Sequence, residues 1–402
     1  MPKSRTIAPL LAAALLLIAL PAAAQKVVDN GPEPAQGLVK AEMHELWRLG
    51  GEDEELFFGT VARVAQDSEG NFYILDGQLS EAHIFSPDGE YMKTVGREGE
   101  GPGEMRQPSD LFITPDGTLN CLTGFPGKVV SITPEDVPAG TIQVREDGHP
   151  MPFGVLIRGL ATSEGLLLGG IRMEFSNSGV SKQNYFLAHC DREGNLLGTL
   201  VAKTHVIDYS EFQLNEEDMD FIWRRMDVGP DDRLYVAEDR DRYSYKVMDL
   251  DGNVEMIVNR EFQAPRRNDR QREVAEQVID AVAKYHPAPL QGKSIRDTEP
   301  ATDSLTVTRD GRVWITPATD ESQLPAGTWT MMDVFGPDGT FEKQVALKGD
   351  FNRNRDAAMI MPDGKLIVVT GALDAFLNQM NAAGGSAGEV APLEVICFEL
   401  EM

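Results

Sequence analysis

Short apolar runs alternate along the chain with tight turns built on Asp-Gly or Glu-Gly, and this arrangement recurs many times. It is plainest in VARVAQDSEGNFYILD and DLFITPDGTLNCL, where two strand-length apolar segments flank a turn. Apolar runs of this length that are bounded by Gly and Asp favour β-hairpins. Repeated copies must stack on one another, because a single copy cannot bury its apolar face. The chain is therefore predicted to be all-β and built from repeated small sheets.

The repeats can be counted as blades of four strands each. The first unit is complete, with strands predicted at Val61 to Gln66, Phe72 to Leu75, Ala82 to Phe85 and Tyr91 to Val95. Second hairpins are marked by Gly89, Gly194, Gly252 and Gly339, with a blurred one near Gly140. Later first strands precede their turns at Leu111 to Thr114, Leu160 to Thr162, Met226 to Val228, Leu305 to Thr308, and Ala358 to Met361. Six blades follow from this count.

The sixth blade lacks its fourth strand, because the chain ends soon after the strand Leu393 to Phe398. Open sheet edges invite aggregation and are normally covered. Near the other end, ELWRLGGEDEELFFGTV parallels the blade connection MKTVGREGEGPGEMRQP, so Glu42 to Leu49 reads as an orphan fourth strand. We therefore expect a six-bladed β-propeller that is closed by an N-terminal strand in the last blade. The alternative, two unrelated β-sandwiches, predicts no such parallel.

The segment FYILDGQLSEAHIFSPDGEYMKTVGREGEGPGEMRQPSDLFITPDGTL resembles one NHL repeat running into the next. The chain is thus similar to the exported bacterial six-bladed propellers of the NHL-repeat-like kind, a group whose function is largely undefined. The similarity covers nearly the whole mature chain and is sharpest in the first two blades. Where such repeats often carry Asn and Arg before the third strand, this chain has Ser80, Glu81 and His83.

The N-terminus has the features of a secretory signal peptide. Lys3 and Arg5 precede an apolar run from Ile7 to Leu20, and Ala22 to Ala24 offer a cleavage site. We expect a signal peptide at 1–24, a lead-in at 25–41 and one propeller domain at 42–402. The run is too short to span a bilayer, and no Cys for a lipid anchor follows it. The protein is predicted to be periplasmic or secreted, with no membrane span, and monomeric.

Charge bears on the partners of the chain, and cysteine content bears on its disulfide bonds. The chain carries 37 basic and 64 acidic residues, a formal net charge of −27. Repulsion from phosphate argues against nucleic acid as a partner. Three cysteines, at 121, 190 and 397, lie in apolar segments and fit buried single thiols better than a disulfide framework. The alternative of one disulfide bridge between two of them is left open by the sequence.

Two insertions interrupt the blade rhythm, and extra backbone on a propeller often carries function. The first ends in Trp223, Arg224 and Arg225, whose residue types can anchor a ligand or simply pack. The second, about 264–300 between blades 4 and 5, is predicted to hold a helix whose apolar stripe is Val274, Val278, Ile279, Val282 and Tyr285, capped by Asn268 or Asp269. Its cluster of Arg266, Arg267, Arg270 and Arg272 either seats an anion or matches acidic residues of the same chain.

No catalytic or metal-binding constellation is visible in the sequence. The six His are scattered, and neither G-x-S-x-G nor a Walker loop occurs. The expected function is a non-catalytic binding or scaffold propeller that recognises a protein or carbohydrate partner through its loops, without metal or cofactor. The binding-face candidates are Arg97, Arg106, Trp223, Arg224 and Arg225. The alternative is a metal-dependent lyase or lactonase that holds Ca or Zn in its central channel. This alternative rests on resemblance of fold alone.

Overall fold

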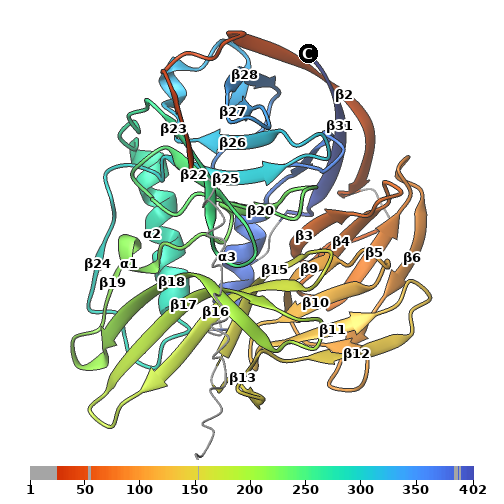
Figure 1. Ribbon diagram of the computed structural model, residues 1–402, viewed down its shortest axis with the longest axis vertical. Coiled ribbons are helices and arrows are strands. Elements are labelled where there is room, and N and C mark those ends of the chain that lie inside the picture. Colours follow the sequence, from red (N-terminus) through yellow and green to blue (C-terminus); the bar gives the residue numbers. More distant parts are fainter. Residues whose placement is uncertain (1–24, 53–55, 153, 384–387, 389–390) are drawn as a thin grey trace, which may run out of the picture.

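Residues 25–52, 56–152, 154–383, 388 and 391–402 are described by a computed structural model. The expected signal peptide at 1–24 lies outside these residues. Within them, four-stranded antiparallel sheets follow one another around a ring (Figure 1). Blade 1 has its four strands where the hydrophobic pattern predicts them: β3 (Val61–Gln66), β4 (Phe72–Asp76), β5 (Glu81–Phe85) and β6 (Tyr91–Val95).

Blades 2 to 4 repeat this order along the chain, and in each the first strand is innermost. Blade 3 is extended, because its last three strands are about twice as long as those of blade 1. The twelve strands are β9 (Pro108–Ile113), β10 (Leu119–Thr123), β11 (Lys128–Ile132) and β12 (Pro138–Ile142); β15 (Gly154–Ala161), β16 (Leu166–Phe175), β17 (Val180–Cys190) and β18 (Leu196–Asp208); β20 (Met226–Val228), β21 (Leu234–Val236), β22 (Ser244–Met248) and β23 (Val254–Arg260).

Blades 5 and 6 share one N-terminal strand, β2 (Leu38–Gly50), and form a continuous eight-stranded sheet. Residues 38–41 of β2 run parallel to β28 of blade 5, and residues 42–50 run antiparallel to β31 of blade 6. The other strands are β25 (Thr302–Val307), β26 (Val313–Pro317), β27 (Thr328–Phe335) and β28 (Phe341–Lys348) in blade 5, and β29 (Ala357–Ile360), β30 (Leu366–Val369) and β31 (Glu394–Glu401) in blade 6.

The first described residues form a belt along the outside of three blades. Strand β1 (Lys26–Asn30) pairs in parallel with β23, so blade 4 has a fifth strand. The chain then reaches blade 5 and finally blade 6 through β2, where Glu42 lies opposite Glu401 and Gly50 opposite Glu394. The segment expected as an orphan fourth strand thus pairs with the last strand of the chain, and the expected lead-in at 25–41 contains further strands.

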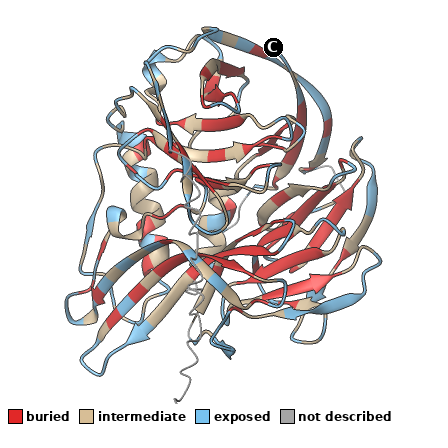
Figure 2. Ribbon diagram, in the orientation of Figure 1, coloured by how far each residue is buried: buried red, intermediate tan, exposed pale blue. Residues whose placement is uncertain are grey.

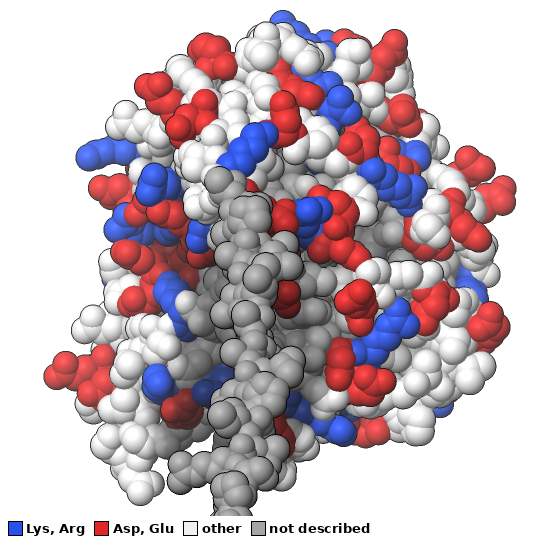
Figure 3. Space-filling view, in the orientation of Figure 1, with Lys and Arg blue, Asp and Glu red and all other residues white. Residues whose placement is uncertain are grey.

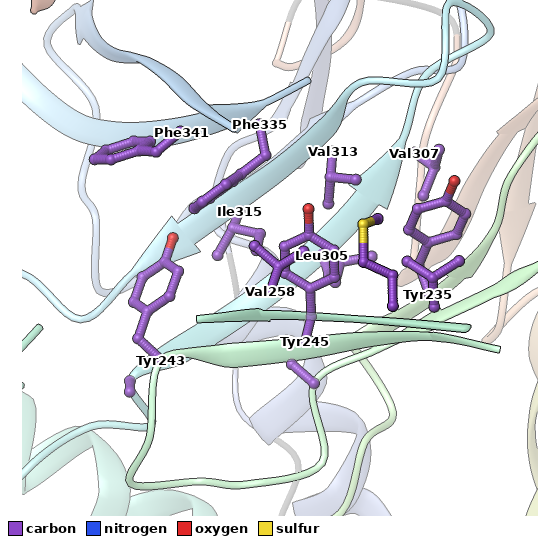
Figure 4. Packing of buried hydrophobic residues seen from close by; sticks show 14 residues of the cluster. Tyr235, Tyr243, Tyr245, Val258, Leu305, Val307, Val313, Ile315, Phe335 and Phe341 are labelled. Carbon is purple, nitrogen blue, oxygen red and sulfur yellow. The ribbon is translucent and has the colours of Figure 1, made fainter. Parts of the chain in front are cut away.

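Apolar side chains fill the spaces between neighbouring blades, so burial is concentrated in the middle strands (Figure 2). Between blades 4 and 5 the aromatic rings of Tyr243, Tyr245 and Phe335 pack together with Val313 and Ile315 (Figure 4). The Tyr243 hydroxyl donates to the Asp333 carboxylate over 2.6 Å, which satisfies a polar group inside this cluster.

Two longer helices lie outside the blades. Helix α2 (Asp269–Ala283) falls in the insertion between blades 4 and 5, and the Asn268 side chain caps its start in a capping box with Gln271. Helix α3 (Ala372–Ala383) connects β30 to β31 and is drawn near the centre of the ring in Figure 1. Shorter elements are α1 (Glu216–Met219), η1 (Tyr209–Glu211), η2 (Glu321–Gln323), β7 (Arg97–Glu98), β8 (Glu104–Met105), β13 (Arg145–Glu146), β14 (His149–Pro150), β19 (Gln213–Asn215) and β24 (Gly292–Ser294).

Three local predictions were wrong. The sequence suggested a single helical insertion, but α3 is a second one. The second hairpin of blade 2 turns at residues 133–137, where Asp136 takes the left-handed conformation, and Gly140 lies inside β12. Tyr285, assigned to the buried stripe of the insertion helix, follows α2 and is exposed, while Ile279 is buried as expected. Among the described residues, no helix has the length and apolar content that crossing a membrane requires.

Candidate functional site

The first strands of the blades surround the central channel, where ligand sites of propellers are commonly found. First strands of blades 1 and 2, 2 and 3, and 4 and 5 contact one another. Charged side chains occupy one equivalent place in three successive first strands, seven residues before the turn glycine: Arg63 before Gly70, Asp110 before Gly117 and Arg158 before Gly165.

Asp110 joins blades 1, 2 and 3 at this level of the channel. Its carboxylate accepts from Arg63 Nε at 2.5 Å, from Arg158 Nη1 at 3.1 Å and from the Gly159 amide at 2.8 Å. Burial raises the pKa of Asp110, whereas the Arg63 guanidinium acts in the opposite direction. The paired charges tie three neighbouring first strands together and fill this part of the channel.

Asp227, on the first strand of blade 4, has a different environment. Among the described residues, the hydrogen bonds to its carboxylate come from the backbone amides of Val228 and Val307, each at 2.9 Å. Burial raises the pKa of Asp227 to about 6, and this effect is partly offset by the two amide hydrogen bonds and, less strongly, by Arg63 on the opposite side of the ring. A carboxyl group with a pKa near neutrality can exchange a proton under ordinary conditions, which makes Asp227 a candidate acid or base in the channel.

The loop face is defined here as the end of the ring where first strands begin and second strands end. Trp223, Arg224 and Arg225 lie on it, immediately before β20. The Trp223 ring packs 4.7 Å from that of Phe221, and Tyr185 lies beside them. Arg224 is exposed and pairs with Asp303 at 3.0 Å.

Arg225, in contrast, is buried and acts within the fold. Its Nη2 donates to Asp220 Oδ2 at 2.6 Å and to the Phe221 carbonyl at 3.1 Å. These bonds hold the Trp223 segment in place. Arg224 is the exposed member of this group, and Trp223 is half-buried against the apolar cluster that includes Tyr185 and Phe221.

Acidic side chains continue the site toward blade 5. Glu299 lies 3.9 Å from Arg353, and burial together with the neighbouring Asp303 carboxylate raises the pKa of Glu299. Arg224, Asp303, Glu299 and Arg353 thus form a row at the loop face in which two acidic groups lie between two guanidinium groups. Such a row can hydrogen-bond polar ligands of either sign.

Arg97 and Arg106, the other predicted binding-face residues, lie in the connection between blades 1 and 2. Arg97 Nε donates to Glu104 at 2.8 Å, and Arg106 pairs with Glu100 at 3.3 Å. Both guanidinium groups are largely exposed. Over residues 25–52, 56–152 and 154–383, no hydrogen bond or ion pair connects them with the Trp223 segment.

Exposed aromatic side chains gather in the loop-face connections. Phe57 precedes the first strand of blade 1, and Phe125 lies between the second and third strands of blade 2. Phe376 lies on α3, which connects the second and third strands of blade 6. Phe125 is 65% exposed. Its loop is fixed by the hydrogen bond from the Leu156 amide to the Gly124 carbonyl (3.1 Å), so the ring is held out into solvent by ordered backbone.

The arginine cluster of the insertion is matched from within the chain. Arg267 forms a bidentate pair with Glu216 at 2.7 Å for each bond, and Arg240 donates to the same carboxylate at 3.0 Å. Arg272 pairs with Asp297. On the surface, Figure 3 shows acidic and basic side chains interspersed over the visible face. The internal match, one of the two readings of this cluster, accounts for Arg267 and Arg272.

The cysteine prediction is confirmed, because Cys121, Cys190 and Cys397 are all buried and free. Burial raises the pKa of each thiol to about 12, so none is a thiolate at neutral pH. Within the described residues, no three His, Cys, Asp or Glu side chains are grouped as a metal site would require.

Sequence reasoning missed the channel residues and the aromatic rim. The signal for the first was present, since Arg63, Asp110 and Arg158 align once the repeats are superposed on their turn glycines. The exposed rings of Phe57, Phe125 and Phe376 carried no comparable signal. A Phe in a connection resembles any other apolar residue until the topology shows at which end of the blade it lies.

The fold and its channel define a six-bladed β-propeller. A family model described as a six-bladed β-propeller, DUF5128, matches residues 52–132. Sequence comparison with curated proteins finds no match. The fold is similar to that of a candidate exported protein from Bacteroides fragilis, with a TM-score of 0.51 and 10% identity over 94% of this chain and 100% of that one.

Two further solved structures align less well. A DUF4221 family member from Bacteroides vulgatus has a TM-score of 0.48 and 11% identity, covering 90% of this chain and 98% of that one. A gluconolactonase from Xanthomonas campestris has a TM-score of 0.42 and 9% identity, covering 89% and 90%. At these values neither likeness carries an argument about activity.

Proposed function

We propose that the protein is an exported, non-catalytic binding propeller that recognises a protein or glycan partner through its loop face. The observation that carries this proposal is the gathering of exposed aromatic rings (Phe57, Phe125 and Phe376) on the face that also presents Trp223 and Arg224. Aromatic and Arg side chains dominate the binding energy of recognition surfaces, because they bury large areas with few rotatable bonds. Export is supported by the charged and apolar N-terminal segment.

The closed ring supplies the rigidity that such a surface needs. We infer that the pairing of β2 with β31 closes the ring in solution, so that the loops of all six blades keep fixed positions. A preorganised surface loses less entropy on binding than a mobile one, which favours affinity.

The proposal is tested by affinity capture from the exported fraction and by a glycan array, using wild type and a double variant. Phe57→Ala combined with Phe125→Ala removes two exposed rings without opening the core, and we expect at least tenfold weaker retention of the bound partner. Tyr91→Ala is the matched control, since this aromatic residue is equally exposed but lies at the hairpin between the third and fourth strands of blade 1. Undiminished retention by the double variant would show that the loop face is not the binding surface.

A second candidate function rests on Asp227. A lyase or lactonase in the central channel needs an acid or base, and the pKa of about 6 suits this carboxyl group to that task. In the metal-dependent form, Ca or Zn would have to be held near it by groups that converge from several blades. Two measurements test the channel site. Elemental analysis of the purified protein detects a bound metal, and turnover of lactones is compared between wild type and Asp227→Asn. Turnover that the substitution leaves unchanged eliminates the channel site.

A further inference from the structure

The insertion between blades 4 and 5 docks against the extended part of blade 3. We call residues 264–300 the insertion lobe. Ile279 and Ala283 of α2 pack against Ile207, Phe212 and Leu214, which lie at and beyond the end of β18. Strand β24 of the lobe pairs in parallel with β19, and the Gln291 amide donates to the Phe212 carbonyl at 2.8 Å. The lobe is thus held by an apolar cluster, a short pair of strands, and ion pairs from Arg267 to Glu216 and from Arg296 to Asp241.

Two imidazoles lie within this docking interface. His286, just after α2, forms a 3.1 Å hydrogen bond between its Nδ1 and the Tyr209 hydroxyl, and its ring lies 4.8 Å from that of Phe212. His205 comes from β18 of blade 3 and places Nδ1 3.7 Å from Asp218 Oδ1. Its Nε2 is buried and has no hydrogen-bond partner among the described residues.

Charged groups that face the two rings act in opposite directions, because the Asp218 carboxylate favours a proton on His205 whereas Lys203 disfavours it. Asp218 is the acidic group that faces His205, while Lys203 on the same strand repels a proton there. On the lobe side, Asp280 of α2 and Lys284, which follows the helix, line the surface hollow beside His286, and Asp280 is already paired with Lys293 at 2.8 Å. A proton on each ring would place two like charges in one interface, because the charge of His205 acts on His286.

We propose that His205 and His286 form an acid-sensitive latch that holds the insertion lobe on blade 3 when both are neutral and releases it when both are protonated. In the docked state, burial lowers the pKa of both imidazoles, and His205 lowers that of His286 further. The released lobe exposes them to water, where the pKa returns to about 6.5. Docking is therefore strongest above about pH 6.5 and weakens as the pH falls below that value, because the released state binds more protons.

Release of the lobe would also alter the loop face. Lys284 Nζ at the end of α2 donates to Asn381 Oδ1 of α3 at 2.6 Å, and the two helices contact each other. Loss of the lobe removes this support from α3, which carries Phe376. Acid would then change the loop face without opening the ring.

Hydrogen exchange of the full mature chain tests the latch, because it resolves individual segments. After correction for intrinsic exchange, the α2 and β24 peptides should exchange at least about tenfold faster at pH 5.0 than at pH 7.5. Peptides from β26 and β27 should not change, since they belong to the ring. The double variant His205→Gln with His286→Asn should lose the pH dependence, because neither amide titrates and the Asn amide replaces Nδ1. His149→Gln, on the exposed strand β14, is the control and should behave as wild type.

Three results would overturn the proposal. One is equal protection of α2 at both pH values. Another is faster exchange at pH 5.0 that persists in the double variant, since other groups would then be responsible. The last is faster exchange of β26 and β27 together with α2, which would indicate global acid unfolding. If the double variant does not fold, His286→Asn alone should give a smaller pH dependence than wild type, and an unchanged one contradicts the latch.

Discussion

Two aspartates in similar positions show how local partners decide chemistry at the scale of single residues. Asp110 and Asp227 both connect the first strands of neighbouring blades, through the Gly159 and Val307 amides respectively. Asp110 also receives two guanidinium groups, whereas Asp227 receives none. The channel therefore contains one buried carboxylate that is bound by two guanidinium groups and one that is bound by two backbone amides, and burial raises the pKa of both.

The residue-scale prediction concerns the link between Arg63 and Asp227. Arg63→Gln removes a positive charge that lowers the pKa of Asp227, so this pKa should rise above about 6. Carbon-13 NMR titration of the Asp carboxyl groups measures it, and Arg233→Gln, a surface arginine paired with Glu255, is the control. An unchanged or lower pKa would contradict the assigned geometry.

The same group predicts a direction for stability against pH. The pKa of Asp227 in the folded protein exceeds the value of about 3.9 expected in the unfolded chain. The folded state therefore binds its proton more readily, and this group opposes folding at neutral pH. Its unfavourable contribution declines as the pH falls from about 6 to about 4.

Among the elements, β2 carries a clear division between its two faces. Trp47 is buried, where its ring meets Phe72 edge-on at 5.0 Å and its Nε1 donates to the Pro87 carbonyl at 3.2 Å. Leu46, its neighbour on the same strand, is exposed. The strand thus joins blade 6 to blade 1 through one aromatic side chain.

Trp47→Ala should lower the free energy of unfolding by about 3–5 kcal/mol, because a large buried ring is replaced by a cavity. Leu46→Ala should change it by less than about 0.5 kcal/mol, as expected for an exposed position. Chemical denaturation of both variants measures the difference. Equal losses for the two would mean that Trp47 does not anchor this strand.

Element prediction from sequence succeeded where apolar runs and turn glycines repeat at regular spacing. Blade 1 and the capped start of α2 are examples, because turn glycines and Asn268 give local signals. Helix α3 was overlooked, although Leu373, Leu377 and Met380 recur at helical spacing. The parallel pairing of β1 with β23 had no local signal at all, since neither strand specifies a partner more than 200 residues away.

On the scale of the whole molecule, the N-terminal belt predicts two grades of damage on truncation. Removal of residues 25–36 takes away β1 and should expose the edge of blade 4 but leave the sixth blade complete. Removal of residues 25–50 also takes away β2 and leaves β31 with an open edge. Such edges pair with other chains.

We therefore expect the shorter truncation to remain monomeric with a lower Tm, and the longer one to self-associate. Size-exclusion chromatography with light scattering measures both. A monomeric, stable product of the longer truncation would show that the ring does not depend on β2.

The site was less predictable than the fold, for a physical reason. Trp223 and Arg224 were found because their residue types are unusual among the neighbouring residues of the chain. The role of Arg225 depends on its pairing with Asp220 and on its burial, and a sequence displays neither. Likewise, the charge of Arg63 acts on Asp227 only because opposite blades face one axis.

The pairing of Glu42 with Glu401 has a kinetic consequence. The two residues are roughly 360 positions apart, so their contact can form only after nearly the whole polypeptide has emerged, and it carries the largest loop-closure cost of any pair of strands. The first three blades are built from neighbouring segments and can assemble early. Folding should therefore end with a slow annealing of the two extremities, and a nascent molecule would pass through an unsealed intermediate that is vulnerable to proteases and to misassembly.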